Sequence, residues 1–503
     1  MKVNQLKAGV ILSYLQMGLG MVISLVYTPL MLRLLGQSEY GLYNISSSVI
    51  SYLNLLQFGF GSSYVRYYSR YKKENAQQKI DSLNALFLTV FSILGAIALL
   101  AGICLAFNCK LIFADGLTEQ ELSIIKILMI VMSINMAISF PASVFVSFIT
   151  ANERFVVQKL VNMLKTVMSP MVTLLVLLLG FRSIGMSVVV TVVTVVTEII
   201  NVVYCLRVLK VRFCFSQMEP KLLVEIASFS GFIALNMLVD EINWNVDKFL
   251  LGRFRGSVAT SVYAVAATLN SYYRNISTSI TNVFTPRIHK IINGENAIHN
   301  IDLLFAKIGR IQFMILALIY SGFVFFGKRF IMIWAGNEYY DAYYIALLLM
   351  GPATIALIQG LGIEIQRAMN MHKFRSIAYS LMSVGNIFIS IPLCLKFGGV
   401  GCAFGTAISL ILANGLMMNF YYHRKMKLDI PYFWGQIGRI FPGLIIPVFL
   451  GTIMTKFTIE CNIMIYLLLI AVYGVAYSVS CWLFSMNQYE KGLLLSVLKK
   501  LKR

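Results

Sequence analysis

The chain has 503 residues, of which 58% are hydrophobic and 13% are charged; the charged fraction is about half that of an average soluble protein. So few charged side chains could not cover the surface of a soluble fold of this size, and the mean hydropathy of +0.78 agrees. The composition therefore indicates an integral membrane protein. Apolar segments recur from residue 10 to residue 484, which leaves no room for a soluble catalytic domain.

The net charge of +21 does not indicate nucleic-acid binding, because the Lys and Arg residues lie in short loops between apolar runs. The eight cysteines are scattered singly, without a CxxC pair or a Cys/His cluster. We therefore expect buried thiols and neither a metal site nor a cofactor. The apolar run from Val10 to Leu32 is too long for the core of a signal peptide, so we interpret it as a retained first span.

Windows of about 20 apolar residues, the length that crosses a bilayer as a helix, predict an all-α polytopic membrane protein with about fourteen transmembrane helices. In chain order we expect them at residues 10–33, 40–63, 82–106, 123–149, 160–180, 184–206, 224–247, 257–284, 308–327, 342–365, 376–395, 400–422, 438–456 and 463–484. The loops on the side of the N-terminus hold 30 Lys and Arg residues and the opposite loops hold 10. This bias predicts that both termini are cytoplasmic.

Short matching segments recur at a nearly constant spacing of 216 to 220 residues. The pairs are Leu34–Gly36 with Leu250–Gly252, Asn152–Phe155 with Met371–Phe374, and Phe181–Gly185 with Phe397–Gly401. They predict two pseudo-symmetric six-helix lobes, at residues 1–210 and 211–430, followed by two appended helices at 431–486. Parallel repeats of this kind favour alternating access between two bundles, although channels can also contain duplicated halves.

The last segment, residues 487–503, combines leucines with five Lys and Arg residues. We expect this basic tail to lie along the inner surface of the membrane, where anionic lipid attracts it. A frayed tail is the alternative interpretation.

Polar residues inside the predicted spans mark a candidate lumen, because an ionisable side chain in hydrocarbon normally faces a partner or a wet cavity. In the seventh span Asn236, Asp240, Asn243 and Asp247 are spaced by 4, 3 and 4 residues and so share one helix face. The eighth span carries Arg274 in a similar row of polar residues along one helix face. The first two spans, which are the corresponding helices of the first lobe, have rows with fewer strongly polar side chains.

We predict that these four helices enclose the substrate. The candidate substrate-binding residues are Asn44, Asn54, Arg66, Asn236, Asp240, Asn243, Asn270, Tyr273 and Arg274. Three carboxylates are candidates for coupling transport to H⁺ or Na⁺: Asp240, Glu241 and Asp247. Structural alternatives stay open, since hydroxyl and amide side chains often pack helices together, an Asp–Arg pair can be structural, and Asp247 can cap the outer end of its span.

The fourteen-span plan, the Leu-Leu-Gly elements after the first and seventh spans, the segment Asp247–Gly252 and the turn before the eleventh span resemble the polysaccharide-biosynthesis flippases of the Wzx type. These proteins belong to the multidrug/oligosaccharidyl-lipid/polysaccharide (MOP) exporter superfamily, which includes the MATE transporters. The resemblance implies export of an undecaprenyl-diphosphate-linked oligosaccharide across a bacterial plasma membrane, through a cavity between the two lobes. It also implies membrane lipid and other polysaccharide-assembly proteins as partners.

Two other functions compete with this one. A small-molecule or drug exporter of the same superfamily would share the repeat, but spans thirteen and fourteen disfavour it. A membrane-embedded glycosyltransferase or polymerase would need a large outer loop with catalytic residues, and the longest outer loops here have about fifteen residues without His or paired carboxylates. We therefore expect a transporter and no enzymatic activity.

Overall fold

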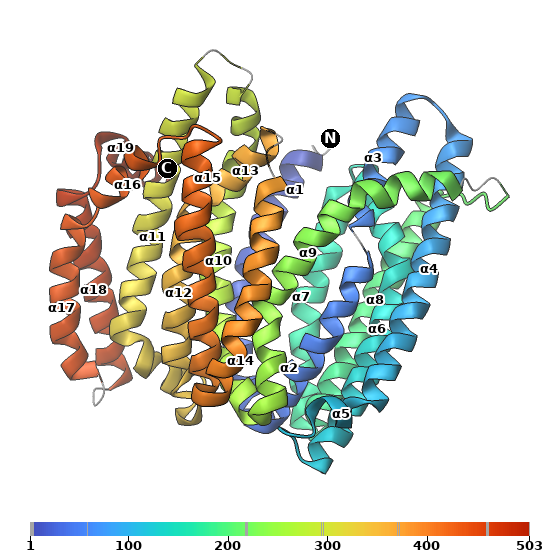
Figure 1. Ribbon diagram of the computed structural model, residues 1–503, viewed down its shortest axis with the longest axis horizontal. Helices are drawn as coiled ribbons and strands as arrows, with labels where there is room; N and C mark the ends of the chain where they lie inside the picture. Colours follow the sequence, from blue (N-terminus) through green and yellow to red (C-terminus); the bar gives the residue numbers. More distant parts are fainter. Residues whose placement is uncertain are drawn as a thin grey trace. The chain divides into compact units, whose positions relative to one another are not determined.

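Figure 1 shows the computed structural model of the chain, which describes residues 5–501 except 58, 217–219, 293, 295, 370, 372 and 459–461. The side chains of residues 6, 7, 10, 220, 221, 223, 227–233, 235, 236 and 497–501 lie outside the description as well. The predicted lumen residue Asn236 is among them. Within the described part every regular element is a helix, which confirms the all-α prediction.

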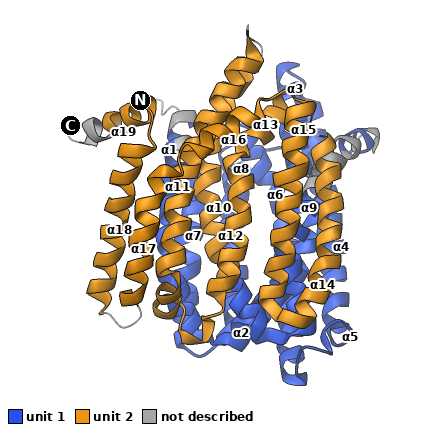
Figure 2. Cartoon of the chain, turned by 60° about the vertical axis from the view of Figure 1, so that its left-hand side comes forward, with its two compact units in different colours: residues 1–264 blue, residues 265–503 orange. Residues whose placement is uncertain are grey.

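The chain forms two compact units, Met1–Ala264 and Val265–Arg503, which divide within one long helix (Figure 2). The first unit holds α1 (Gln5–Leu35), α2 (Gln37–Ser51), the 3-10 helix η1 (Tyr52–Gln57), α3 (Phe60–Lys73), α4 (Gln77–Phe107), α5 (Cys109–Phe113), α6 (Glu119–Ala151), α7 (Phe155–Leu178), α8 (Arg182–Arg207), α9 (Pro220–Phe254) and the start of α10 (Gly256–Ile292). The predicted lobe boundary at residue 210 stays a prediction.

The second unit holds the rest of α10 and the remaining elements. These are α11 (Ala297–Trp334), η2 (Asn337–Tyr339), α12 (Ala342–Ile358), α13 (Gly360–Ala368), α14 (Lys373–Leu410), the π-helix η3 (Ile411–Met418), α15 (Asn419–Arg424), α16 (Ile430–Gly438), α17 (Pro442–Thr458), α18 (Ile463–Phe484) and α19 (Gln488–Leu501).

Nine helices among the described residues are long and apolar enough to cross a membrane, or ten if the bent pair α16–α17 counts as one span. The chain is therefore a multi-pass membrane protein. Predicted spans missing from this count fall on α9, on α10 and on helices with breaks. The second span is divided at Gly59 (φ 67°), and the eleventh and twelfth join through a kink at Gly398. The structure is compatible with fourteen spans, and the full count stays a prediction.

Two turns of the proposed repeat have related backbone geometry. Gly180 (φ 87°) and Arg182 (φ 42°) reverse the chain between α7 and α8, and Gly398 (φ 59°) interrupts α14. Positive φ is easy for glycine because it has no Cβ. The α7–α8 turn is held by Glu39 of α2, whose carboxylate accepts hydrogen bonds from the backbone N–H and the hydroxyl of Ser183.

The first unit is a bundle in which α6 packs on α4, α8 and α2, while α1 packs on α7. Its core is rich in aromatic rings, such as Tyr64, Phe87 and Phe91. The Tyr64 hydroxyl donates to Asn84 Oδ1 at 2.5 Å, and Asn84 in turn donates to the carbonyl of Arg212 at 2.9 Å. Large apolar side chains also lie on the outside of this unit, and Leu100, for example, is 67% exposed. Such exposure suits helices that face lipid.

The second unit is organised around α11, which packs on α12, α16, α17 and α18. Three tyrosines of α18 fix it to α11 through their hydroxyl groups. Tyr466 donates to the carbonyl of Phe326 at 2.9 Å, Tyr473 to Ser321 Oγ at 2.7 Å, and Tyr477 to the carbonyl of Met314 at 2.7 Å. We call these three residues the tyrosine ladder.

A buried ion pair fastens the C-terminal helix α19 to α11. Arg310 and Glu490 have side chains only 4% and 3% exposed, and the guanidinium contacts both carboxylate oxygens, at 2.7 and 3.0 Å. Arg310 also donates to the carbonyls of Gln436 and Ser485, both at 2.7 Å. The start of the predicted tail is therefore a docked helix.

Candidate functional site

The polar face of α9 lies in the first unit, where α9 packs on α2, η1 and α3. Asp247 is buried and accepts a hydrogen bond from the hydroxyl of Tyr263, the residue in the first turns of α10. Glu241 is partly exposed and accepts a hydrogen bond from Asn245 Nδ2 at 2.6 Å. Asp240 is exposed and Asn243 is partly exposed. The face thus changes from a buried, bonded carboxylate to accessible ones within two helical turns.

The predicted residues of the second span lie on three different elements. Asn44, on α2, donates to the carbonyl of Tyr40 within its own helix at 2.9 Å. Asn54 is exposed on η1, and Arg66 is exposed on α3. Because η1 packs against α9, the structure brings the segment that carries Asn54 to the polar helix. A helix that unwinds inside a span is a common way to present polar backbone and side chains to a substrate.

The polar residues of α10 face two different environments within the second unit. Tyr273 and Asn270 are 1% and 2% exposed, and the Tyr273 hydroxyl lies 2.7 Å from Thr354 Oγ1 of α12. Ser277 and Thr281 both accept hydrogen bonds from Gln312 Nε2 of α11 at 2.9 Å. These contacts point to helix packing as the role of this side of α10. Arg274, by contrast, is partly exposed.

The candidates are therefore divided between the units: Asp240, Glu241 and Asp247 lie in Met1–Ala264, and Arg274 lies in Val265–Arg503. The predicted pairing of an Asp with Arg274 stays a prediction, as do the substrate and ion-coupling roles. Among the described residues no group of three or more His, Cys, Asp and Glu side chains could hold a metal ion. The two polar faces carry carboxylate, amide, hydroxyl and guanidinium groups, all of which can form hydrogen bonds with a polar molecule.

Two polar residues with important contacts were missed by the sequence analysis. Arg310 lies at the start of the predicted span 308–327 without a predicted partner, whereas in the structure it is buried in α11 and pairs with Glu490. Glu121 was passed over, although the spacing Thr118 to Glu121 is a capping-box pattern and the structure contains that capping box. Each residue also bonds a partner more than 80 positions away, Glu121 with Ser38 and Arg310 with Glu490, and no local sequence pattern reveals these contacts.

Comparison with known proteins adds a family and a fold. The family model described as "Polysaccharide biosynthesis protein" matches residues 6–292, more than half of the chain. No curated protein sequence matches the chain.

Solved structures match over most of the chain. "Lipid II flippase MurJ, inward closed conformation" is 17% identical, with a TM-score of 0.73, and the match covers 95% of this chain and 98% of that one. A multidrug resistance MATE family transporter of the MOP superfamily is 14% identical, with a TM-score of 0.57 and coverage of 84% and 98%. The Vibrio cholerae MATE transporter VcmN is 13% identical, with a TM-score of 0.55 and coverage of 86% and 98%. The chain therefore has the fold of MOP-superfamily transporters and flippases, and these relatives are not enzymes.

Proposed function

We propose, from the premise that the chain belongs to the polysaccharide biosynthesis protein family, that it is a flippase for a lipid-linked oligosaccharide. The substrate would be an undecaprenyl-diphosphate-linked repeat unit, carried from the inner to the outer leaflet of a bacterial plasma membrane by alternating access. The observation that carries this proposal is the presence of polar faces on α9 and α10 in a family member in which nine other described helices are long and apolar enough to cross a membrane.

The chemistry of the proposed substrate fits these faces. A diphosphate is an anion with several oxygen acceptors, and a planar guanidinium such as that of Arg274 can bind two phosphate oxygens with parallel hydrogen bonds. Sugar hydroxyls would pair with the accessible Asp240, Asn243 and Asn54. The apolar lipid tail would stay in the bilayer, so only the head group needs a polar path. Either Asp240 or Glu241 would couple export to H⁺ or Na⁺.

Orientation and partners belong to the same proposal. The loop charge bias places both termini in the cytoplasm. The glycan emerging outside would pass to other polysaccharide-assembly proteins. The buried attachment of α19 at Glu490 supports a tail that stays close to the helices, where its Lys residues would meet anionic lipid.

A small-molecule exporter is the second candidate, because MATE transporters share the fold. The lipid II flippase matches 95% of this chain, against 84% and 86% for the two MATE structures. A longer match favours the flippase, since it leaves less of this chain without a counterpart.

The test is a leaflet assay with purified protein in liposomes that contain fluorescent undecaprenyl-diphosphate oligosaccharide. A glycan-modifying enzyme added outside reports how fast the inner pool becomes exposed. We expect protein-dependent exposure, slowed about tenfold or more by Arg274→Ala, because hydrogen bonds to a charged group are worth about 1.5–3 kcal/mol.

The matched control is Arg70→Ala, which removes a surface arginine whose side chain is 64% exposed and paired with Glu74. It should transport like the wild type. Absence of exposure across several glycans under an imposed ion gradient would refute the flippase, and export of cationic dyes would then establish the small-molecule transporter.

A further inference from the structure

One carboxylate, that of Glu121, joins three separate segments of the first unit. Its Oε1 accepts hydrogen bonds from the hydroxyl of Ser38, at 2.8 Å, and from the hydroxyl of Ser257. Its Oε2 accepts from the backbone N–H and the hydroxyl of Thr118, at 3.0 and 3.1 Å. Oε2 therefore fixes the carboxylate to the start of its own helix, α6. Oε1 connects the start of α2, at Ser38, to the start of α10, at Ser257.

Glycines bring the backbones of the same segments into direct contact. A Cβ on Gly41 of α2 would overlap the carbonyl oxygen of Ser257. A Cβ on Gly256 (φ 87°) would lie 2.6 Å from the carbonyl oxygen of Gly116, in the α5–α6 loop. Close approach of two backbones is a role that only glycine fills. Next to them Arg253 donates to the carbonyl of Ile112.

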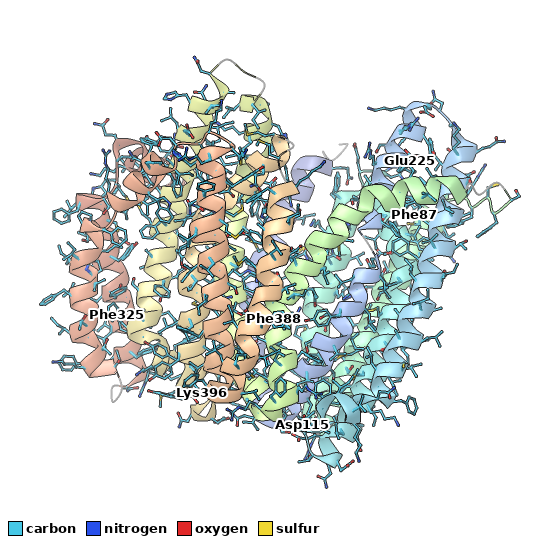
Figure 3. The ribbon with its side chains drawn as sticks, in the orientation of Figure 1. Phe87, Asp115, Glu225, Phe325, Phe388 and Lys396 are labelled. Carbon is cyan, nitrogen blue, oxygen red and sulfur yellow. The ribbon has the colours of Figure 1, made fainter. Side chains whose placement is uncertain are left out.

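We call this group of contacts the outer seam. Its residues are Ser38, Gly41, Gly116, Glu121, Gly252, Arg253, Gly256 and Ser257. The seam joins residues of the predicted first lobe to the end of α9 and the start of α10, which follow residue 210. Its loops belong to the set poor in Lys and Arg, which the charge bias places outside. In Figure 3, Asp115 marks this end of the first unit and Glu225 marks the opposite end.

We propose that the outer seam is the gate that closes the outer side of the transport path, with Glu121 as its latch. This inference rests on the proposed function, since a gate matters only if a substrate leaves on this side. The seam must part in every cycle and re-form afterwards.

The composition of the seam suits a joint that opens. The bonds that Glu121 makes across the seam go to the hydroxyl groups of Ser38 and Ser257, and water can replace such bonds at the membrane surface. Arg253 adds a bond to the carbonyl of Ile112 and a partly exposed ion pair with Asp115, at 3.5 Å, which is weak. When Ser38 and Ser257 move away, the capping box with Thr118 still holds Glu121 at the start of α6, where the helix dipole favours a negative charge. Glu121 therefore stays in position to accept hydrogen bonds from Ser38 and Ser257 again when the seam closes.

A reversible cross-link tests whether the seam has to part. The Oγ atoms of Ser38 and Ser257 are 3.2 Å apart, so cysteines at both positions can form a disulfide. We expect the oxidised Ser38→Cys/Ser257→Cys protein to lose at least about tenfold in leaflet-assay rate, and dithiothreitol to restore it. Each single variant, oxidised in the same way, should keep its rate.

The comparison cross-link is Asn135→Cys/Thr191→Cys, which joins α6 to α8 inside the predicted first lobe, where Asn135 Nδ2 and Thr191 Oγ1 are 3.2 Å apart. Mass spectrometry has to verify this disulfide first, because a cysteine Sγ at 135 lies one bond nearer the backbone than Nδ2. That disulfide should leave transport unchanged. If the Ser38–Ser257 disulfide, verified by mass spectrometry, also leaves the rate unchanged, the seam is a static joint and the inference is wrong.

A labelling measurement tests the latch without any glycan. Ser261 is fully buried one turn beyond the seam on α10. In a protein whose exposed Cys104 is replaced by Ser, Ser261→Cys should react slowly with a membrane-impermeant maleimide added outside. Adding Glu121→Gln weakens two bonds to a charged acceptor, and we expect the rate to rise roughly tenfold. Glu119→Gln is the control, because Glu119 is 76% exposed and pairs with Lys110 instead.

The two measurements separate the inference from the proposed function. Faster labelling with Glu121→Gln, in a protein that flips no glycan, would support the gate and refute the flippase. Transport that tolerates the disulfide, with labelling unaffected by Glu121→Gln, would refute the gate and leave the flippase intact.

Discussion

Glu121 and Glu490 are both carboxylates that connect segments distant in the sequence, but their surroundings differ. Glu490 meets the buried guanidinium of Arg310, and both side chains are less than 5% exposed. Glu121 is partly exposed and its donors are hydroxyl and amide groups. These surroundings decide which of the two contacts can open during a transport cycle.

Separating Arg310 from Glu490 would leave a charge buried without its counter-charge, which is very costly in a low-dielectric interior. Separating Glu121 from Ser38 and Ser257 leaves a carboxylate at a membrane surface, where water replaces the lost bonds. We therefore expect the ion pair of Arg310 to keep α19 attached to α11 throughout the transport cycle. The contacts of Glu121 at the outer seam, by contrast, can open.

The largest effect is expected for Arg310→Ala. Removing one partner of a buried ion pair costs about 3–5 kcal/mol, mainly because the remaining charge is unpaired. Thermal unfolding in detergent, followed by circular dichroism, should show a marked loss of stability. The double variant Arg310→Met/Glu490→Met should recover most of it, since well-packed apolar side chains often replace a buried ion pair without loss. A double variant as unstable as the single one would show that the hydrogen bonds to Gln436 and Ser485 matter more than the charges.

A smaller effect, with a conformational signature, is expected for Gly41→Ala. The added methyl group overlaps the backbone of Ser257, and overpacking of this kind costs about 1–3 kcal/mol. Because the seam can separate, part of the strain should be relieved by opening, so labelling of Ser261→Cys from outside should rise.

Gly18→Ala is the control for this change, because a Cβ at Gly18 on α1 meets no atom within 4 Å. It should be neutral or slightly stabilising, since alanine is the better helix former. Loss of stability in Gly41→Ala without faster labelling would contradict a seam that opens.

Sequence reasoning could predict the parts of this structure that depend on local patterns. The membrane helices follow from apolar runs, and the interruption at Gly398 follows from a glycine pair between two such runs. The break of the second span could not be predicted as firmly, because η1 between Tyr52 and Gln57 is stabilised by packing against α4 and α9. Contacts such as Glu121 with Ser257, 136 positions apart, depend on how helices pack in space. The same holds for the contact between the Tyr273 hydroxyl and Thr354 of α12, 81 positions apart.

The smallest effect is expected for Tyr473→Phe in the tyrosine ladder. The change removes a hydroxyl that donates to Ser321 Oγ at 2.7 Å and keeps the ring, whose centroid lies 5.5 Å from that of Phe326. Hydrogen bonds between membrane helices average about 0.6 kcal/mol, so the melting temperature should fall only slightly. Tyr473→Ala, which also removes the ring packing, should cost several times more. If Tyr473→Phe were instead as damaging as Arg310→Ala, hydroxyl bonds alone would fasten α18 permanently. The distinction between contacts made by hydroxyl groups, which can open, and a buried ion pair, which stays closed, would then fail.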